Sequence, residues 1–270
     1  MVVKMSSIKR PRVKLNSVKY SRKAEMPSDY IFILEDKAMK KNEKMIADCG
    51  GIEMPTPEKC HNGITELVFI IDRSGSMSGL EADTIGGFNS TIESQREKGG
   101  KVYVSTVLFD HESYVLHDRV DIEKVEKMTR RNYQVRGSTA LLDAVGDAMH
   151  HIKNVHKYAR PEDVPEHTIF VITTDGMENA SCRYTQRMIK TRITRAQNER
   201  GWEFIFLGAN IDVAQTADDL GIRRDRATNY KYDPKGVDAS YRTMNKAIAN
   251  VRDRNDDFDL GDIMDEEDKK

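Results

Sequence analysis

The sequence predicts an α/β fold with a doubly wound, mostly parallel central sheet flanked by helices and one antiparallel strand at the sheet edge. Short apolar runs of strand length alternate along the chain with longer segments whose apolar residues recur at helical spacing. Strands and helices that alternate in this way form parallel sheets through right-handed crossovers. A tight turn at 110–112 joins two strand-like segments, so we expect the second of them to run antiparallel to the first.

The strands are expected where apolar and β-branched residues concentrate. Segments 66–71 and 168–174 are short, mostly apolar runs, as expected of strands that are buried on both faces. The segment at 113–119 is the expected antiparallel edge strand. The complete set of expected strands is 66–71, 102–109, 113–119, 168–174, 203–207 and 228–232.

The helices are expected where apolar residues share one helical face. Leu80, Phe88 and Ile92 mark the first helix, which should end near Glu97 because two glycines follow it. Two further helices should begin soon after Thr139 and Asp175. The helices after the first are marked by residues 141–152, 188–196, 212–220 and 237–251.

Charge and composition divide the chain into four parts. Residues 1–29 form a basic arm that we expect to be disordered, with eight lysines and arginines and no acidic residue before position 24. Residues 30–63 are apolar enough to form an extension docked on the domain. The domain itself is expected at 64–252, and residues 253–270 are an acidic tail that we also expect to be disordered.

Cysteine usage and hydropathy indicate a cytoplasmic protein. Cys49, Cys60 and Cys182 form no Cys-x-x-Cys pattern, and a core of this size needs no disulfide. The first residues lead into basic sequence without a signal-peptide apolar segment. No run approaches the roughly 18 apolar residues of a membrane span, so we expect no membrane association.

Five side chains from distant parts of the sequence predict one divalent-metal site. Asp72, Ser74 and Ser76 directly follow the first strand, Thr139 precedes a helix, and Asp175 ends the strand at 168–174. In an open α/β sheet the carboxyl ends of the strands face the ligand crevice. Hydroxyl and carboxylate oxygens suit Mg²⁺ or Mn²⁺, with Ca²⁺ also compatible, and they argue against zinc.

In this pattern the chain resembles the von Willebrand factor A domain family, which has a Rossmann-like sheet and a metal-ion-dependent adhesion site. The family motif is Asp-x-Ser-x-Ser, a distant Thr and an Asp commonly followed by Gly, and all five positions match here. The resemblance implies that Ser74, Ser76 and Thr139 bind the ion directly. It implies that Asp72 and Asp175 act directly or through water, and it leaves open which of them is a direct ligand. The cytoplasmic expectation departs from the family's secreted members.

The function expected from this resemblance is metal-dependent protein binding by a module that is not an enzyme. Neutral hydroxyls and only two carboxylates leave the ion with positive charge, so an Asp or Glu of a protein partner is the expected further ligand. One alternative is a Mg²⁺-dependent phosphoryl-transfer enzyme or hydrolase, although position 74 is Ser rather than a second Asp. Another is an accessory subunit that binds nucleic acid through its basic arm, although Tyr20 is the arm's only aromatic residue.

Other residues near the expected site have ordinary structural explanations beside functional ones. Asn210 and Asp212 follow a strand end, but a glycine turn in which Asp212 caps the next helix is the favoured interpretation. Glu178 and Asn179 are candidates for the rim of the site or for a helix start. A contact rim is a hypothesis for Arg73, Met77, Arg136 and Met177. Surface positions are expected for His111, His117, His150, His151 and His156.

Overall fold

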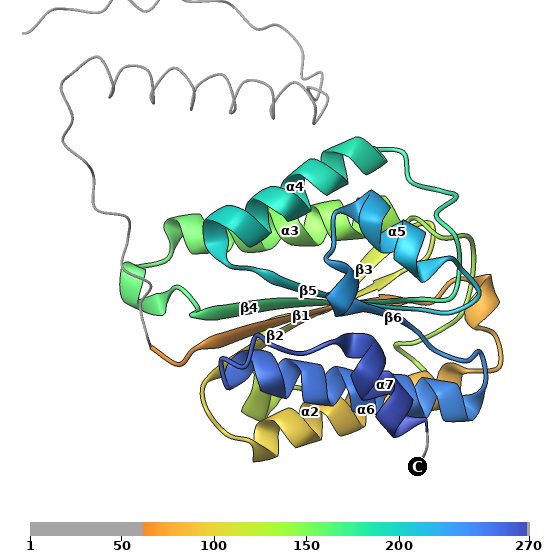
Figure 1. Cartoon of the computed structure of the whole chain (residues 1–270), viewed down its shortest axis with the longest axis horizontal. Coiled ribbons are helices and arrows are strands. Elements are labelled where there is room, and N and C mark those ends of the chain that lie inside the picture. The colour runs from red at the N-terminus through yellow and green to blue at the C-terminus, as the bar shows by residue number, and fades with distance from the viewer. Residues whose placement is uncertain (1–61, 269–270) are drawn as a thin grey trace, which may run out of the picture. The chain divides into compact units, whose positions relative to one another are not determined.

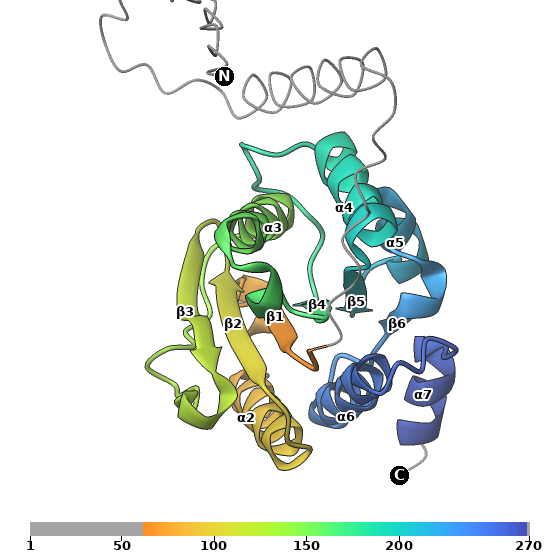
Figure 2. The same ribbon diagram turned by 90° about the vertical axis from the view of Figure 1, so that its left-hand side faces the viewer.

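A six-stranded sheet in the order β3-β2-β1-β4-β5-β6 runs through residues 62–268, the part of the chain described by the structure, a computed structural model. Only the β2–β3 pair is antiparallel among these strands, with β3 at one edge of the sheet and β6 at the other (Figure 2). The predicted fold class is confirmed. The strands are β1 (Thr65–Asp72), β2 (Val102–Phe109), β3 (Ser113–Asp121), β4 (His167–Thr174), β5 (Glu203–Gly208) and β6 (Ala227–Asn229).

Helices cover both faces of the sheet (Figure 1). One face carries α3, α4 and α5, and the other carries α2, α6 and α7. The α-helices are α2 (Glu81–Glu97), α3 (Leu141–Tyr158), α4 (Gln186–Arg200), α5 (Val213–Leu220), α6 (Pro234–Arg252) and α7 (Leu260–Glu267). Single 3₁₀ turns are η1 (Gly75–Met77), η2 (Ile122–Lys124), η3 (Pro161–Asp163) and η4 (Arg224–Arg226). No helix within residues 62–268 is long and apolar enough to cross a membrane.

The central strand β1 is buried along its whole length. Its side chains alternate between the two faces of the sheet, so Phe69 joins the core beneath α2 and α6 while Ile70 joins the core beneath α3 and α4. Parallel pairing aligns Asp72 with Phe109 of β2 and Ile71 with Thr173 of β4. The carboxyl ends of these three strands therefore lie at one edge of the sheet, which we call the carboxyl edge.

The expectation that the acidic tail at 253–270 is disordered is wrong for residues 260–267, which form α7. Leu260 and Met264 are buried in the core that α6 shares with the sheet. The buried carboxylate of Glu267 accepts a 2.8 Å hydrogen bond from Arg242 and lies 2.9 Å from Lys246, both on α6. Two apolar residues four positions apart face the core, and ion pairs join the segment to the basic helix α6. These contacts order a segment whose net charge alone predicted disorder.

Two of the histidines expected at the surface are buried. His117 on β3 hydrogen-bonds the Thr106 hydroxyl at 3.0 Å, and His156 on α3 lies 3.5 Å from the buried carboxylate of Glu66. The strand expected at 228–232 is present but shorter. The basic arm at 1–29 and nearly all of the extension at 30–63 lie outside the described residues.

Candidate metal centre

The structure brings all five predicted site residues together at the carboxyl edge. Asp72 ends β1, Ser74 and Ser76 lie in the loop and 3₁₀ turn that follow it, and Thr139 lies just before α3. Asp175 directly follows β4. Two backbone hydrogen bonds join the loops: Gly75 N–H donates to Gly137 O at 3.0 Å, and Arg136 N–H donates to Arg73 O at 2.9 Å.

The hydroxyl groups converge on one point beside Asp175. The Ser74 and Ser76 Oγ atoms are 2.9 Å apart, and Ser76 Oγ donates a 2.6 Å hydrogen bond to Asp175 Oδ1. A Cβ atom built on Gly176 would lie 3.0 Å from Thr139 Oγ1, 3.2 Å from Ser76 Oγ and 3.8 Å from Ser74 Oγ. Three neutral oxygens therefore surround the space next to this glycine.

The carboxylates of Asp72 and Asp175 differ in the hydrogen bonds that they already accept. Both oxygens of Asp72 accept hydrogen bonds, Oδ1 from Ser74 N–H at 2.7 Å and Oδ2 from the Thr174 hydroxyl at 2.6 Å. In contrast, Asp175 Oδ2 is buried without a hydrogen-bond partner among the described residues. A buried acceptor without a partner is costly, and a bound cation would remove that cost.

These donors fit a hard divalent ion. The set contains only hydroxyl and carboxylate oxygens, which is the ligand chemistry of Mg²⁺, Mn²⁺ and Ca²⁺. Burial raises the pKa of both Asp72 and Asp175, although hydrogen bonds from Thr174 and Ser76 oppose the rise. Ionising both groups next to each other is unfavourable without a positive charge, so a cation complements this pair.

Asp72 should make metal binding depend on pH. Burial raises its pKa from 3.8 to about 6, so in the metal-free fold it gains a proton as the pH falls through about 6. That proton stabilises the metal-free fold relative to the unfolded chain, and it competes with the ion for the same carboxylate. We expect the apparent Mg²⁺ affinity to fall by about tenfold per pH unit below about pH 6. The gain in Tm on adding Mg²⁺ should be clear at pH 7.5 and small at pH 5, and an equal gain at both would contradict this.

Gly176 leaves the space that the hydroxyl oxygens surround. Its added Cβ would approach two of these oxygens more closely than an ordinary van der Waals contact. We expect Gly176→Ala to lower Mg²⁺ affinity by about tenfold or more while the chain stays folded, because the methyl group competes with the ion for space. Calorimetric titration with Mg²⁺ measures the effect, and Gly86→Ala is a matched control because nothing lies within 4 Å of a Cβ added there. Equal affinities in the two variants would contradict the prediction.

Residues that the sequence did not predict support the candidate centre through hydrogen bonds. Thr174 supports Asp72 through its hydroxyl, and Tyr133 donates a 2.5 Å hydrogen bond to the Asp72 carbonyl oxygen. Tyr232 donates hydrogen bonds to the carbonyl oxygens of Ser76 and Ser78. No local motif marks these contacts, because each joins segments that are distant in sequence.

The sequence offered two interpretations of Glu178 and Asn179, as part of the rim of the site or as a helix start. In the structure both residues hydrogen-bond the backbone around Thr139. Asn179 Oδ1 accepts a 2.9 Å hydrogen bond from Thr139 N–H. Glu178 Oε2 accepts a 2.9 Å hydrogen bond from Leu142 N–H in the first turn of α3. The segment after Asp175 thereby sets the position of Thr139.

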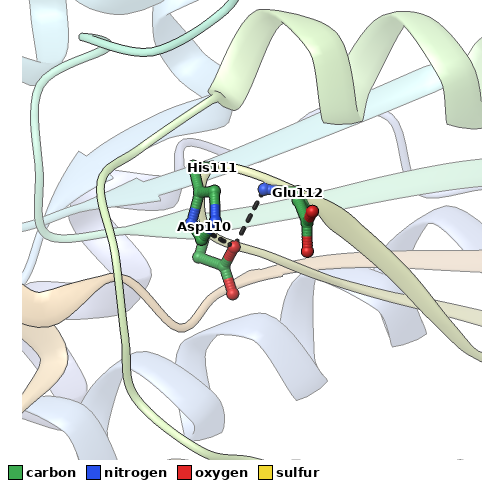
Figure 3. Close-up of side chains that lie close together, drawn as sticks. All are labelled: Asp110, His111 and Glu112. Atoms are coloured by element: carbon green, nitrogen blue, oxygen red, sulfur yellow. Dashed lines mark hydrogen bonds and ion pairs between the residues drawn. The ribbon is translucent and has the colours of Figure 1, made fainter.

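A second cluster of ligand-type atoms lies beside the centre at Asp110, His111 and Glu112, within 4.8 Å of one another (Figure 3). Asp110 Oδ1 accepts a 2.8 Å hydrogen bond from Glu112 N–H and lies 2.9 Å from His111 Nδ1. Asp110 Oδ2 lies 2.9 Å from both Arg73 Nε and Arg136 Nε.

These contacts already satisfy the Asp110 carboxylate. Burial alone would raise the pKa of Asp110, but the Glu112 N–H and the two guanidinium groups lower it overall. A metal ion would have to displace both arginines. We therefore interpret this cluster as an anchor for the loops that carry Asp72 and Thr139.

The predicted contact rim is divided in the structure. Arg73 and Met77 are buried, whereas Arg136 and Met177 are exposed at the carboxyl edge. Asp212 accepts a 3.0 Å hydrogen bond from Gln215 N–H and caps α5, as favoured from the sequence.

Comparisons with known proteins yield similarities at the level of structure. No protein-family model and no curated protein matches the sequence. Similar solved structures include a variant of the PilB minor pilin from Streptococcus sanguinis, at 12% identity over 69% of this chain and 62% of the pilin, with a TM-score of 0.49. The vWF domain of the pili tip protein Mfa5 from Porphyromonas gingivalis is 13% identical over 69% of this chain and 95% of that domain, with a TM-score of 0.49. Manganese-loaded TRAP protein from Plasmodium vivax is 15% identical over 66% of this chain and 72% of that one, with a TM-score of 0.44.

The structural neighbours thus include von Willebrand factor A domains. This chain spans less than two thirds of the PilB pilin. Identities of 12–15% and TM-scores below 0.5 assign neither a family nor a function. Any function has to be inferred from the residues of this chain.

Proposed function

We propose that this chain is a von Willebrand factor A-type binding module that holds a divalent ion at Asp72, Ser74, Ser76, Thr139 and Asp175. The observation that supports this most strongly is the convergence of three hydroxyl oxygens beside a buried, unpartnered oxygen of Asp175. The ion would be Mg²⁺ or Mn²⁺, with Ca²⁺ also compatible with the oxygen donors.

The recognised group is a carboxylate of a protein partner. An ion bound mainly by neutral hydroxyls supplies a positive charge that accepts an anionic oxygen ligand. Ser76 and Gly75 are exposed, so the centre faces solvent at the carboxyl edge. Partner Asp and Glu side chains have the charge and the oxygen donors that this position accepts.

Binding rather than catalysis fits the groups around the centre. His111, which adjoins the loop that leads to Thr139, has its Nδ1 atom engaged with Asp110 and packs against Gly137. Arg73 is likewise paired with Asp110. Arg73 stays protonated and cannot act as a general base, and among the described residues the His111 side chain makes no hydrogen bond to any of the five site residues. The cytoplasmic location inferred from the cysteines remains part of the proposal.

The direct test is an NMR titration of the full chain with the capped dipeptide acetyl-Gly-Glu-amide. We expect saturable shifts with Mg²⁺ present, no saturable shifts in EDTA, and no saturable binding of acetyl-Gly-Gln-amide under either condition. The glutamine dipeptide is the matched control because it differs only in charge. Binding of the Glu dipeptide that persists in EDTA, or equal binding of both dipeptides, would contradict a metal-held carboxylate.

A further inference from the structure

Exposed large apolar side chains gather at the same edge as the candidate metal centre. Tyr114 and Val115 begin β3 beside the Asp110 turn, since Ser113 pairs with Phe109 at the end of β2. Met177 follows Asp175 by two residues, and Tyr232 contacts the Ser76 loop. Within the described residues only Tyr158 is similarly exposed elsewhere, and it ends α3, the helix that begins at this edge. Exposed apolar groups gathered in one place indicate a contact surface.

Met177 and Tyr232 adjoin the part of the centre formed by Ser76 and Asp175. Met177 is 74% exposed, and Tyr232 is 38% exposed. The Tyr232 hydroxyl is spent on the carbonyl oxygens of Ser76 and Ser78, which fixes the ring against the loop. The ring is therefore a positioned surface rather than a free side chain.

The border on the Thr139 side has a different character. His111 lies against Gly137, and Arg136 is half exposed while it pairs with Asp110 and Glu112. These polar groups are already paired with one another. Tyr114 and Val115 begin β3 on this side as well, whereas Met177 and Tyr232 adjoin Asp175 and Ser76 themselves. The two sides of the centre would therefore contact different parts of a partner.

Water competes with a partner's carboxylate for an exposed ion. The bond between the carboxylate and the ion is therefore weak unless solvent is excluded. An apolar side chain packed beside that bond excludes water and adds its own burial energy. Methionine and tyrosine suit this role, because both are enriched at protein interfaces.

We propose that the partner carries a large apolar side chain directly next to its acidic residue, and that this side chain packs on Met177 and the ring of Tyr232. This inference rests on the proposed function, because it assumes that the acidic residue meets the ion. It adds a specificity rule: an acidic residue flanked by small or polar residues binds more weakly.

The test compares three capped dipeptides with the full chain in Mg²⁺ by NMR titration. We expect acetyl-Phe-Glu-amide or acetyl-Glu-Phe-amide to bind about fivefold or more tightly than acetyl-Gly-Glu-amide. Met177→Ser should abolish this preference while it leaves both the affinity for Mg²⁺ and the binding of acetyl-Gly-Glu-amide unchanged. Tyr158→Ser, an exposed apolar residue at the far end of α3, is the control and should retain the preference.

The outcomes separate the two proposals. Equal Mg²⁺-dependent binding of all three dipeptides to the wild type would overturn the apolar contact and leave the carboxylate site standing. A preference that survives in Met177→Ser and Tyr232→Ser alike would also overturn it. Failure of every dipeptide to bind in Mg²⁺ would overturn both proposals.

Discussion

Asp72→Asn should lose metal binding and yet leave the metal-free protein at least as stable as the wild type. The amide has nearly the shape of the carboxylate but no charge to offer an ion, so we expect Mg²⁺ and Mn²⁺ affinity to fall by about 100-fold or more. A pKa raised from 3.8 to about 6 means that the ionised carboxylate costs up to about 3 kcal/mol of folding free energy at neutral pH. The substitution relieves that cost, partly offset because the amide has a single acceptor oxygen and can keep only one of the two hydrogen bonds, from Ser74 N–H or from the Thr174 hydroxyl.

Calorimetric titration measures the affinity, and thermal unfolding in EDTA measures the stability. Asp118→Asn is the matched control, because Asp118 is exposed on β3 and pairs with His151 away from the centre. That variant should bind Mg²⁺ like the wild type. Unchanged affinity in Asp72→Asn, or a loss of affinity accompanied by unfolding, would contradict the prediction.

Asp110→Ala should destabilise the fold by about 3–5 kcal/mol, because it leaves the guanidinium of Arg73 buried without its partner. The loops of Asp72 and Thr139 both depend on this anchor, since Arg73 lies between Asp72 and Ser74 and Arg136 precedes the Thr139 loop. Urea unfolding measures the loss. We also expect weaker Mg²⁺ binding in the folded fraction.

Two further variants show whether the unpaired charge is the cause. Arg73→Met combined with Asp110→Leu replaces the buried pair with apolar groups and should be markedly more stable than Asp110→Ala alone. Glu112→Ala, on the exposed part of the same turn, should change stability by less than about 0.5 kcal/mol. A loss below about 1 kcal/mol in Asp110→Ala would show that the anchor is dispensable.

Local sequence pattern predicted the sheet and the strand-end carboxylates well. Asp72 and Asp175 each follow a short apolar run, and such a run by itself predicts a strand buried in a parallel sheet. Thr139 has no such signal, and only the resemblance to a family motif connected it with the other four residues. The structure places its hydroxyl with those of Ser74 and Ser76 around the Gly176 position.

The supporting residues could not be predicted, because their roles exist only in tertiary contacts. Asp110 belongs to what the sequence shows as an ordinary hairpin turn, and its partners come from loops 26 and 37 residues away. Tyr232 meets Ser76 across 156 residues of sequence. The helix at 260–267 was missed for another reason: abundant acidic residues concealed the four-residue spacing of Leu260 and Met264.

The measurement that tests the metal centre most directly is the anomalous difference map of a crystal of the full chain grown with Mn²⁺. We expect one strong peak among the hydroxyl oxygens of Ser74, Ser76 and Thr139 and the carboxylate of Asp175. A peak at Asp110, His111 and Glu112 alone, or no peak at the carboxyl edge at saturating Mn²⁺, would contradict the proposed centre.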